Sequence, residues 1–459
     1  MMWTAQQLAD ITRGTLHVDA DVAVTGISTD TRELQRGDAF VAIVGERFDG
    51  ADFATAAIHA GAALVIAQRE VGVPSIVVRD AQEALGRIAR AHLDTLPHTT
   101  VVAITGSSGK TSTKDLVAQV LSHAGETVAP VGSFNNEVGL PRTVLTATEN
   151  TRFLVLEMGM RGLGHIATLC EIAPPDIAAV LNIGSAHVGV VGSRDDIARG
   201  KSEILAALHA DGVAVINRDD SYAQLCRDAA RGSVLEFGFD EGTVHASDVR
   251  LDDLARGSFT LHIVDESAPV ELSLLGEHQI ANALAAATIA HACGMDVRTI
   301  AHALSEATPR SRWRMELHEL PNGVIVINDA YNANPESMRG ALRALAAMGS
   351  QRRTWAILGE MRELGDAAVE EHDAIGRLAV RLDIAKLVAV GDMGKLIQMG
   401  AAHEGSWGEE AVHVRDLDAA VDYVTDRWEP GDVILVKASR SIGLDRVAQS
   451  LIDRGSRKN

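Results

Sequence analysis

The stretch VVAITGSSGKTSTKDLV, Val101–Val117, decides how the middle of the chain folds. Four apolar, β-prone residues lead into a glycine-rich turn, and beyond Lys110 and Thr111 the apolar residues recur with helical spacing. A strand, a glycine loop and a helix in this order predict a phosphate-binding loop, because backbone N–H groups at the helix start can hold phosphate oxygens. The loop is a shortened form, since Ile104 stands where the full pattern has another glycine. The plain alternative is an ordinary strand–turn–helix.

Phosphate transfer also needs a cation and metal ligands, and candidates for both follow from the pattern. Lys110 would reach the terminal phosphates, and the Thr111 hydroxyl would bind Mg²⁺. Glu157 ends the apolar run FLVLE and supplies a carboxylate for the metal. His187, in LNIGSAHVG, also follows an apolar strand and is a candidate at the same sheet edge. The plain alternatives are a solvated acid and an ordinary loop histidine.

Composition limits the class of protein. The 459 residues predict about three domains, and 46% apolar with 23% charged residues is typical of a globular chain. A net charge of −20 argues against a nucleic-acid partner, which would need a basic patch. Three distant cysteines favour neither a zinc pair nor a disulfide framework. No stretch has the pattern of a signal peptide or of a membrane span, so we expect a cytoplasmic protein.

Strand-like and helical runs alternate along the chain, which is typical of α/β folds with mostly parallel sheets. The segments PHTT, Pro97–Thr100, and ATPRSRWRME, Ala307–Glu316, interrupt this pattern. We therefore expect a small α/β N-terminal domain at 1–98, a central P-loop ATPase-type domain with a parallel sheet and helices at 99–309, and a C-terminal Rossmann-like domain at 310–459.

Two other classes of nucleotide-binding protein compete with an enzyme of group transfer. A GTPase needs an Asn-Lys-x-Asp motif, and Asn217–Asp220, NRDD, has arginine at the lysine position. An acidic turn after a strand explains that stretch better. A regulator that binds a nucleotide-sugar without turnover would need neither a phosphate loop nor a metal carboxylate.

Further stretches are similar to one enzyme family. GSFNNEVGLPRTVL at 132–145, the segment that begins LEMGMRGLGHIATLC at 156–170, GEHQIANALAA at 276–286 and INDAYNANPESM at 327–338 resemble the Mur ligases of peptidoglycan synthesis. Within that family they are most similar to the members that add D-alanyl-D-alanine, and the resemblance spans almost the whole chain. The phosphate loop alone would indicate only the superfamily, which includes folylpolyglutamate synthase. The DNPR motif of the diaminopimelate-adding relatives is absent.

The resemblance implies an ATP-dependent ligase that joins D-alanyl-D-alanine to UDP-N-acetylmuramoyl-tripeptide. ATP would phosphorylate the terminal carboxylate of the tripeptide, and the amine of the dipeptide would displace phosphate from the acyl phosphate. ATP and two Mg²⁺ ions are the implied cofactors, and the two substrates are the implied partners of a monomer. Another amide ligase of the superfamily and a non-catalytic nucleotide-sugar-binding regulator are the alternatives.

The resemblance also assigns residues to the reaction and to ATP. The implied catalytic residues are Lys110, Glu157, His187 and Lys201. Lys201, in ARGKSEIL, matches a lysine that is carbamylated in the family, and the plain alternative is a surface lysine. Thr111, Glu157, His187 and, if carbamylated, Lys201 would bind metal. The implied ATP-binding residues are Thr105, Gly106, Ser107, Ser108, Gly109, Lys110, Thr111, Ser112, Asn282, Arg314, Asp329, Tyr331, Asn332 and Asn334. His278 lies in the same motif as Asn282.

The substrates are assigned to three further groups. The UDP part would lie in the first domain, near Ser28, Thr29, Asp30, Thr31 and Arg32 and near Arg47, Phe48, Asp49 and Gly50. Family members more often have serine where this chain has Thr31. The middle-domain group, facing the peptide or the uridine, is Asn135, Asn136 and Glu137. Because basic residues at a strand end suit an anion, the carboxylate of the dipeptide is assigned to Lys437, Ser439 and Arg440, although an exposed basic turn is a close alternative.

Overall fold

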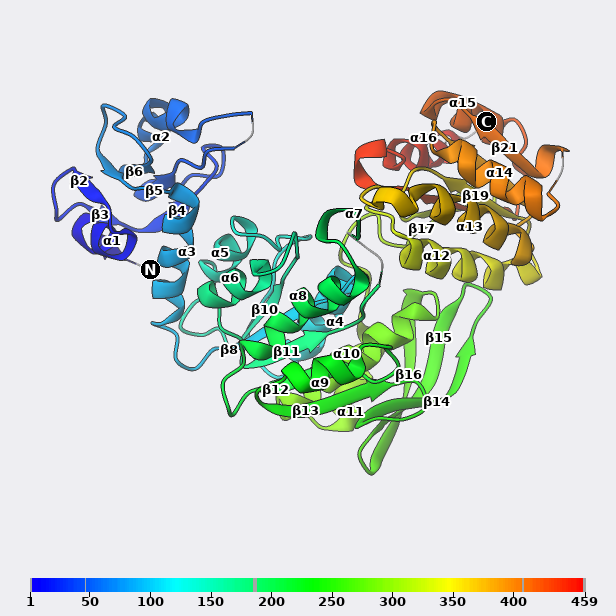
Figure 1. Ribbon diagram of the computed structural model, residues 1–459, viewed down its shortest axis with the longest axis horizontal. Helices are drawn as coiled ribbons and strands as arrows, with labels where there is room; N and C mark the ends of the chain where they lie inside the picture. Colours follow the sequence, from blue (N-terminus) through cyan, green and yellow to red (C-terminus); the bar gives the residue numbers. More distant parts are fainter. Residues whose placement is uncertain (1, 46, 185–187, 407, 457–459) are drawn as a thin grey trace. The chain divides into compact units, whose positions relative to one another are not determined.

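The computed structural model describes the chain except residues 1, 46, 185–187, 407 and 457–459. The chain forms two compact units (Figure 1). The first unit comprises residues 1–103, 125–159 and 165–176, and the second unit comprises residues 104–124, 160–164 and 177–459. Within the described residues, the strands form sheets of two, nine, six and five strands.

The N-terminal region is a small α/β fold. Its five-stranded sheet has the order β2-β7-β6-β5-β4, and a two-stranded sheet pairs β1 with β3. The strands are β1 Trp3–Thr4, β2 Thr15–His17, β3 Ala23–Val24, β4 Gly26–Ser28, β5 Asp38–Val41, β6 Leu64–Ala67 and β7 Ser75–Val77. The helices are α1 Ala5–Thr12, η1 Gly50–Phe53, α2 Ala54–Ala60 and α3 Ala81–Leu93. Helix α2 ends at Gly61, whose φ of 112° lies in the left-handed region that glycine adopts without strain.

The middle region contains the nine-stranded sheet, in the order β16-β15-β14-β13-β12-β11-β8-β10-β9. Its strands are β8 Thr100–Thr105, β9 Thr127–Val128, β10 Phe153–Glu157, β11 Ile177–Val180, β12 Val213–Asn217, β13 Ser233–Gly238, β14 Val244–Leu251, β15 Arg256–Ile263 and β16 Glu266–Leu275. Its helices are α4 Lys110–Leu121, α5 Gly139–Val144, α6 His165–Ile172, α7 Val188–Val191, α8 Arg194–Ala206, α9 Ala223–Ala229, α10 His278–Ala292 and α11 Val297–Glu306.

One end of this sheet differs from the strand–helix alternation that the sequence predicted. Strands β14, β15 and β16 follow one another without an intervening helix and pair antiparallel. Burial alternates along β15 with a period of two residues, so that one face of the strand is buried and the other is partly exposed to solvent. Such one-sided strands need no crossover helix, and short turns join them instead.

The C-terminal region has a six-stranded sheet in the order β17-β18-β22-β19-β20-β21, parallel except for the β17–β18 pair. Its strands are β17 Glu316–Glu319, β18 Ile325–Asn328, β19 Thr354–Leu358, β20 Lys386–Val390, β21 Ala411–Val414 and β22 Val433–Lys437. Its helices are α12 Pro335–Ala347, η2 Met348–Ser350, η3 Gly365–Ala367, α13 Ala368–Arg381, α14 Gly394–Glu404, η4 Gly408–Glu410, α15 Leu417–Thr425, η5 Arg440–Ile442 and α16 Asp445–Ser456.

Helices cover both faces of this C-terminal sheet (Figure 1). Apolar residues of α12, α13 and α14 form one core against it, and those of α15 and α16 form another. A parallel sheet buried on both faces needs continuous apolar strands, and all five residues of β19 and of β22 are buried. This arrangement confirms the Rossmann-like architecture that the sequence predicted.

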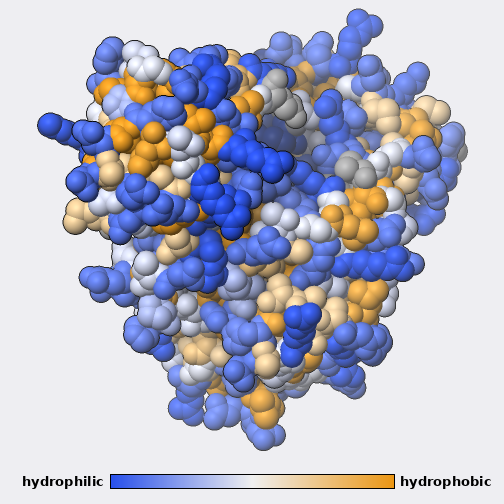
Figure 2. Space-filling model, turned by 60° about the vertical axis from the view of Figure 1, so that its left-hand side comes forward, coloured by the Kyte–Doolittle hydropathy of each residue, from blue (hydrophilic) through white to orange (hydrophobic). Residues whose placement is uncertain are grey.

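The surface is hydrophilic with scattered apolar patches in the view of Figure 2. The most exposed large apolar side chains include Val131, at 89% exposure, and Phe48, at 71%. In the part of the chain that the structure describes, no helix combines the length and the apolar character that a membrane crossing requires.

Candidate active site

The glycine loop joins β8 to α4, and an added Cβ atom would be crowded at both of its glycines. Gly109 has φ of 79°, and a Cβ atom there would lie 2.5 Å from Asn282 Oδ1. A Cβ atom at Gly106 would lie 3.0 Å from the Cβ of Leu181. The backbone of the loop therefore passes close to its neighbours, and the residues that begin α4 are reached only through a left-handed glycine.

The start of α4 has no cap from a side chain of the described residues. Lys110 lies on the first turn, and its Nζ donates a 2.8 Å hydrogen bond to the carbonyl oxygen of Gly106. The helix start therefore combines the backbone N–H groups of a first helical turn, the positive end of the helix dipole and an ammonium group. An anionic phosphate is the ligand that such a combination favours.

Asn182, a residue that was not predicted from the sequence, braces the glycine loop. Its Oδ1 accepts hydrogen bonds from the backbone N–H groups of Ser107, at 3.0 Å, and Ser108, at 2.9 Å. Its Nδ2 donates to the carbonyl oxygen of Ser108 at 3.2 Å. Asn182 stands in LNIGSAHVG, directly after the strand β11, so its position at the sheet edge was the signal that could have revealed it.

Lys201 lies on α8 and reaches the same loop. It is buried, at 1% exposure, and its Nζ donates a 3.0 Å hydrogen bond to the Gly106 carbonyl oxygen, which also accepts from Lys110. The alternative interpretation of Lys201 as a surface lysine was wrong, because its side chain is buried. Burying an amine is costly unless it forms hydrogen bonds, and the Gly106 carbonyl oxygen is such a partner for Lys201. Lys201 therefore lies inside the site and not on the surface.

Glu157 is held inside the first unit. It ends β10 at 1% exposure, and Asn135 Nδ2 donates a 2.7 Å hydrogen bond to its Oε1. The carbonyl oxygen of Asn135 accepts from the N–H of Gly159 at 2.8 Å, which fixes the backbone beside the carboxylate. Asn135 therefore orients Glu157, a role that the sequence did not predict for it.

The two residues after Asn135 have other partners. Asn136 Oδ1 accepts from the N–H of Gly139 at 2.8 Å, at the start of α5. Glu137 Oε1 lies 2.7 Å from His165 Nε2, and both side chains are mostly buried. The sequence analysis did not identify His165.

Two loops of the N-terminal region carry the residues predicted to hold the UDP part. Asp30 accepts from the Arg32 guanidinium, with 2.5 Å between Oδ2 and Nη2, and these bonds hold the pKa of Asp30 well below its usual range. Asp49 Oδ1 accepts from Ala51 N–H at 2.8 Å and so caps η1. Phe48 and Arg47 are exposed. Ser28, Thr29 and Thr31, in the loop that carries Asp30, are half-buried.

In the C-terminal region an ion pair joins the ends of two strands. Lys437 ends β22 and is buried, and its Nζ lies 2.6 Å from Asp329 Oδ2 just beyond β18. The same ammonium donates to the carbonyl oxygens of Asn332, at 2.9 Å, and Asp329, at 3.5 Å. Asp329 Oδ1 accepts from Met315 N–H at 3.1 Å. All three ammonium hydrogens of Lys437 therefore have partners inside the protein.

Asn334 connects the C-terminal region to the glycine loop within the second unit. Its side chain caps α12 by accepting from Ser337 N–H at 2.9 Å, and its Nδ2 donates to the Ser107 carbonyl oxygen at 3.2 Å. Nearby, the Arg314 guanidinium lies 4.1 Å from the centre of the Tyr331 ring. Ser439 Oγ accepts from Arg362 N–H at 2.9 Å.

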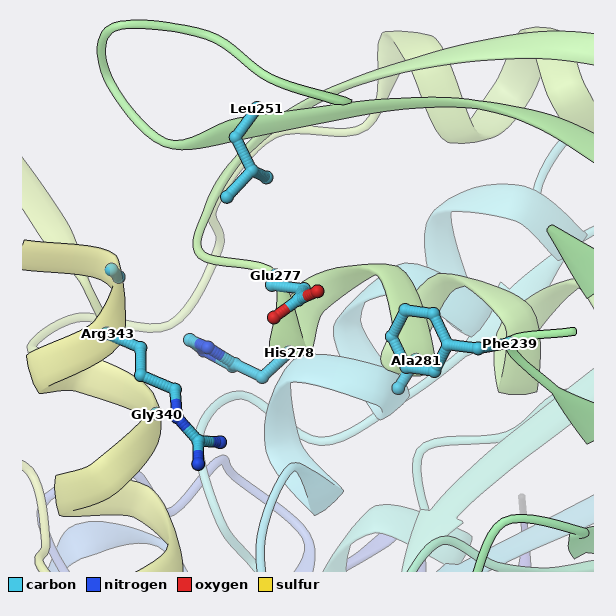
Figure 3. A pocket seen from close by; sticks show the side chains of 8 residues that line it. Phe239, Leu251, Glu277, His278, Ala281, Gly340 and Arg343 are labelled. Atoms are coloured by element: carbon cyan, nitrogen blue, oxygen red, sulfur yellow. The ribbon is translucent and has the colours of Figure 1, made fainter. Parts of the chain in front are cut away.

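A cavity of about 360 Å³ lies beside the start of α10. Its lining residues are Phe239, Leu251, Glu277, His278, Ala281, Gly340, Arg343 and Ala344. Figure 3 shows His278 pointing toward the helix that carries Gly340 and Arg343, with Phe239 beside Ala281. Burial lowers the pKa of His278, which keeps the imidazole neutral near pH 7, and its Nδ1 has no partner among the described residues.

Asn282 lies one turn along the same helix and faces the glycine loop. Its Oδ1 accepts from Thr113 Oγ1 at 3.2 Å, and its Nδ2 donates to Gln279 Oε1 at 2.8 Å. His187 lies outside the described residues. Among the residues that are described, no three His, Cys, Asp or Glu side chains converge as a metal site would require.

Comparison with known proteins agrees with this architecture. The Mur ligase family, catalytic domain, matches residues 23–98, the Mur ligase middle domain matches 104–290, and the Mur ligase, glutamate ligase domain, matches 313–440. The UDP-N-acetylmuramoyl-tripeptide–D-alanyl-D-alanine ligase of Mycobacterium tuberculosis is 46% identical, over 98% of this chain and 97% of its own. The enzyme of the same name from Escherichia coli is 32% identical, over 99% of both chains.

Solved structures are similar over the same length. MurF from Acinetobacter baumannii superposes with a TM-score of 0.91 at 31% identity, covering 99% of both chains. MurF from Thermotoga maritima, in complex with ADP, superposes with a TM-score of 0.83 at 29% identity, covering 94% of this chain and 97% of its own. With matching domains along its length and relatives of this identity, the chain belongs to the Mur ligase family.

Proposed function

We propose that the chain is an ATP-dependent ligase that joins D-alanyl-D-alanine to UDP-N-acetylmuramoyl-tripeptide and so forms UDP-N-acetylmuramoyl-pentapeptide. The observation that carries the proposal is the glycine loop that leads through Gly109 into α4, with Lys110 and Lys201 both donating to the Gly106 carbonyl oxygen. The choice of substrates rests on the relatives of that name, which match over nearly the whole chain.

The chemistry explains why a peptide-forming enzyme needs a phosphate loop. A carboxylate is a poor electrophile, so the tripeptide carboxylate first takes the γ-phosphoryl group of ATP, and ADP leaves. The dipeptide amine then attacks the acyl phosphate carbon, loses a proton and expels inorganic phosphate. Because the carboxylate and ATP are both anionic, cations must lower the repulsion between them, and we assign this role to Lys110.

We assign the nucleotide to the second unit. The first N–H groups of α4 would hold phosphate oxygens, together with the loop residues Thr105–Ser112. Arg314 would add a positive charge, and Asp329, Tyr331 and Asn332 lie on the proposed ribose side. The cavity beside His278 is our candidate for the base, because it lies at the end of the helix that carries Asn282.

Mg²⁺ is the proposed metal, and it would supply electrostatic stabilisation of the phosphates. The hydroxyl of Thr111 and the carboxylate of Glu157 are oxygen donors of the kind that Mg²⁺ prefers. Lys201 fits a second ion only as a carbamate, since an ammonium repels a metal. His187 is the remaining proposed ligand for that ion.

We assign the other substrates to the flanking domains, at 1–98 for the UDP part and 310–459 for the dipeptide, around the central domain at 99–309. Ser28–Arg32 and Arg47–Gly50 would hold UDP, and Asn135, Asn136 and Glu137 would line the peptide or uridine side. Ser439 and Arg440 would meet the dipeptide carboxylate. Lys437 would shape this site through Asp329, because its ammonium hydrogens already have partners. We also propose that the protein is a monomer in the cytoplasm.

The decisive experiment measures phosphate release from ATP with UDP-N-acetylmuramoyl-tripeptide, with and without D-alanyl-D-alanine, using both the diaminopimelate and the lysine tripeptide. Release that needs both substrates, with the pentapeptide product detected by mass, is the expected result. Release with glutamate and a folate instead would retain the superfamily and reject these substrates. Tight nucleotide-sugar binding without any release would favour a regulator.

A further inference from the structure

The segment Arg312–Met315, which leads into the C-terminal domain, has an unusual backbone. Trp313 has φ of 58° and Met315 has φ of 52°, so two non-glycine residues in the left-handed region flank Arg314. Residues other than glycine, asparagine and aspartate rarely adopt this backbone conformation, and it persists only where the surroundings enforce it.

Hydrogen bonds hold the segment in place. Trp313 N–H donates to Glu316 Oε2 at 2.9 Å, and the Trp313 carbonyl oxygen accepts from Tyr331 N–H at 3.1 Å. Met315 N–H donates to Asp329, the partner of Lys437. None of these bonds uses the indole ring of Trp313, so the ring and the backbone of this residue can be tested separately.

The indole ring instead meets an arginine from another part of the domain. The Arg440 guanidinium carbon lies 4.0 Å from the centre of the Trp313 ring, and Arg440 Nη1 lies 3.2 Å from Asp445 Oδ1. The ring contacts the face of the guanidinium, and Asp445 binds one corner. These two contacts fix the plane of a side chain that is otherwise half exposed.

We propose that Trp313 is a positioning residue, which presents the guanidinium of Arg440 to the carboxylate of the incoming dipeptide. The inference rests on the proposed function. A ring over the guanidinium does not occupy its in-plane N–H groups, and within the described part of the chain Asp445 is the one ion-pair partner, at Nη1, so Nε and Nη2 can bind a carboxylate with two hydrogen bonds. A guanidinium held in advance loses less conformational freedom when the ligand binds.

The test compares three substitutions of Trp313 with one control. Trp313→Asn removes the ring and keeps a residue that tolerates the left-handed backbone, whereas Trp313→Phe keeps an aromatic face. We expect the KM for D-alanyl-D-alanine to rise about fivefold to tenfold in Trp313→Asn and Trp313→Ala, with the KM for ATP unchanged, and to recover in Trp313→Phe. Arg427→Ala, which removes the cation of a matched stack 4.2 Å from Tyr423, should leave both KM values unchanged.

A double substitution and a blocked dipeptide test the route through Arg440. Arg440→Ala combined with Trp313→Asn should raise the dipeptide KM no further than Arg440→Ala alone. The double variant and Arg440→Ala should each discriminate less than the wild type against D-alanyl-D-alanine amide. Provided that the wild type makes product, three results would overturn the inference. They are additive effects of the two substitutions on the dipeptide KM, an unchanged dipeptide KM in Trp313→Asn, and an equal rise in the KM for ATP. A wild type that makes no product from D-alanyl-D-alanine would instead reject the proposed function, and this inference with it.

Discussion

Two loops of the second unit lead from a parallel strand into a helix, and they begin their helices in opposite ways. The loop after β8 enters α4 through Gly109, with no capping side chain among the described residues. The loop after β18 enters α12 through Asn334, whose side chain and that of Ser337 form a reciprocal capping box, followed by Pro335. The first helix thus has an N-cap residue without a side chain, and the second is capped by its own residues.

The same contrast extends to the neighbouring loops of the C-terminal domain. After β19, the N–H of Met361 donates to His372 Nε2 at 2.9 Å, and the N–H of Arg362 donates to Ser439. Side chains of the same domain thus satisfy these two backbone N–H groups, whereas in the glycine loop Asn182 accepts from the N–H groups of Ser107 and Ser108. Closed loops fix the shape of a site, and an open helix start gives it affinity for an anion.

The largest effect should come from the cation of the open loop. Lys110→Ala removes the ammonium that would neutralise developing charge on the phosphates, and we expect kcat to fall about a thousandfold or more with the fold unchanged. Circular dichroism and phosphate release measure the two properties. The matched control is Lys395→Ala, which removes an exposed lysine of α14. If Lys110→Ala retained its turnover, the loop after β8 would have no special role in phosphate transfer compared with the loop after β18.

Gly109 tests whether the open start depends on its backbone. In Gly109→Ala the new methyl group would meet Asn282 Oδ1, and we expect the KM for ATP to rise about tenfold to a hundredfold. Gly294→Ala is the control, since Gly294 has a similar φ of 84° and nothing within 4 Å of an added Cβ. It should cost about 1 kcal/mol of unfolding free energy, measured by denaturant titration, and leave the KM unchanged. Equal KM values in the two variants would mean that the close approach to Asn282 has no role.

Asn334 separates the cap of the closed loop from its contact with the open one. Asn334→Ser keeps a capping oxygen and loses the bond to the Ser107 carbonyl, so the KM for ATP should rise about threefold with little change in stability. Asn334→Ala should show the same KM and lose about 1 kcal/mol of unfolding free energy in addition. If the KM for ATP rose in proportion to the loss of unfolding free energy across the two variants, the bond from Asn334 to the Ser107 carbonyl oxygen would have no separate role in ATP binding.

The smallest effect concerns His372, which closes the loop after β19. Its Nε2 accepts from Met361 N–H, its Nδ1 lies 2.6 Å from the Ala368 carbonyl oxygen, and burial lowers its pKa. A histidine with a lowered folded-state pKa contributes stability above its unfolded pKa of about 6.5 and loses it as the pH falls below that value.

His372→Gln keeps one donor and one acceptor and does not titrate. We therefore expect the wild type to lose more unfolding free energy than this variant between pH 7.5 and pH 5.5, while both bind ATP equally at pH 7.5. Denaturant titrations at the two pH values measure the difference. Equal losses would show that protonation of His372 does not open the loop.

Local pattern was enough to predict the elements that hold the proposed site. The glycine loop between β8 and α4, the end of α2 at Gly61 and the apolar strands of the C-terminal sheet follow from short-range rules of spacing, capping and composition. The position of Glu157 at the end of a strand followed for the same reason.

The contacts between distant segments could not be predicted in this way. The local pattern places Asn182 at the sheet edge but does not show that its side chain braces Ser107, and nothing near Lys201 shows that it is buried against Gly106. The three antiparallel strands at the edge of the middle sheet also depend on what covers one of their faces. These features arise from packing between segments far apart in sequence, which periodicity does not encode.

The division of the chain into two units has a consequence for its synthesis. The chain passes from one unit to the other after residues 103, 124, 159, 164 and 176, so neither unit is one continuous segment. A ribosome completes the first unit when residue 176 has emerged, whereas residues 104–124 belong to the second and must wait. The glycine loop is therefore made long before Asn182, Lys201, Asn282 and Asn334 exist to hold it. The newly made polypeptide can gain its nucleotide site only late in translation, after most of the chain has been synthesised.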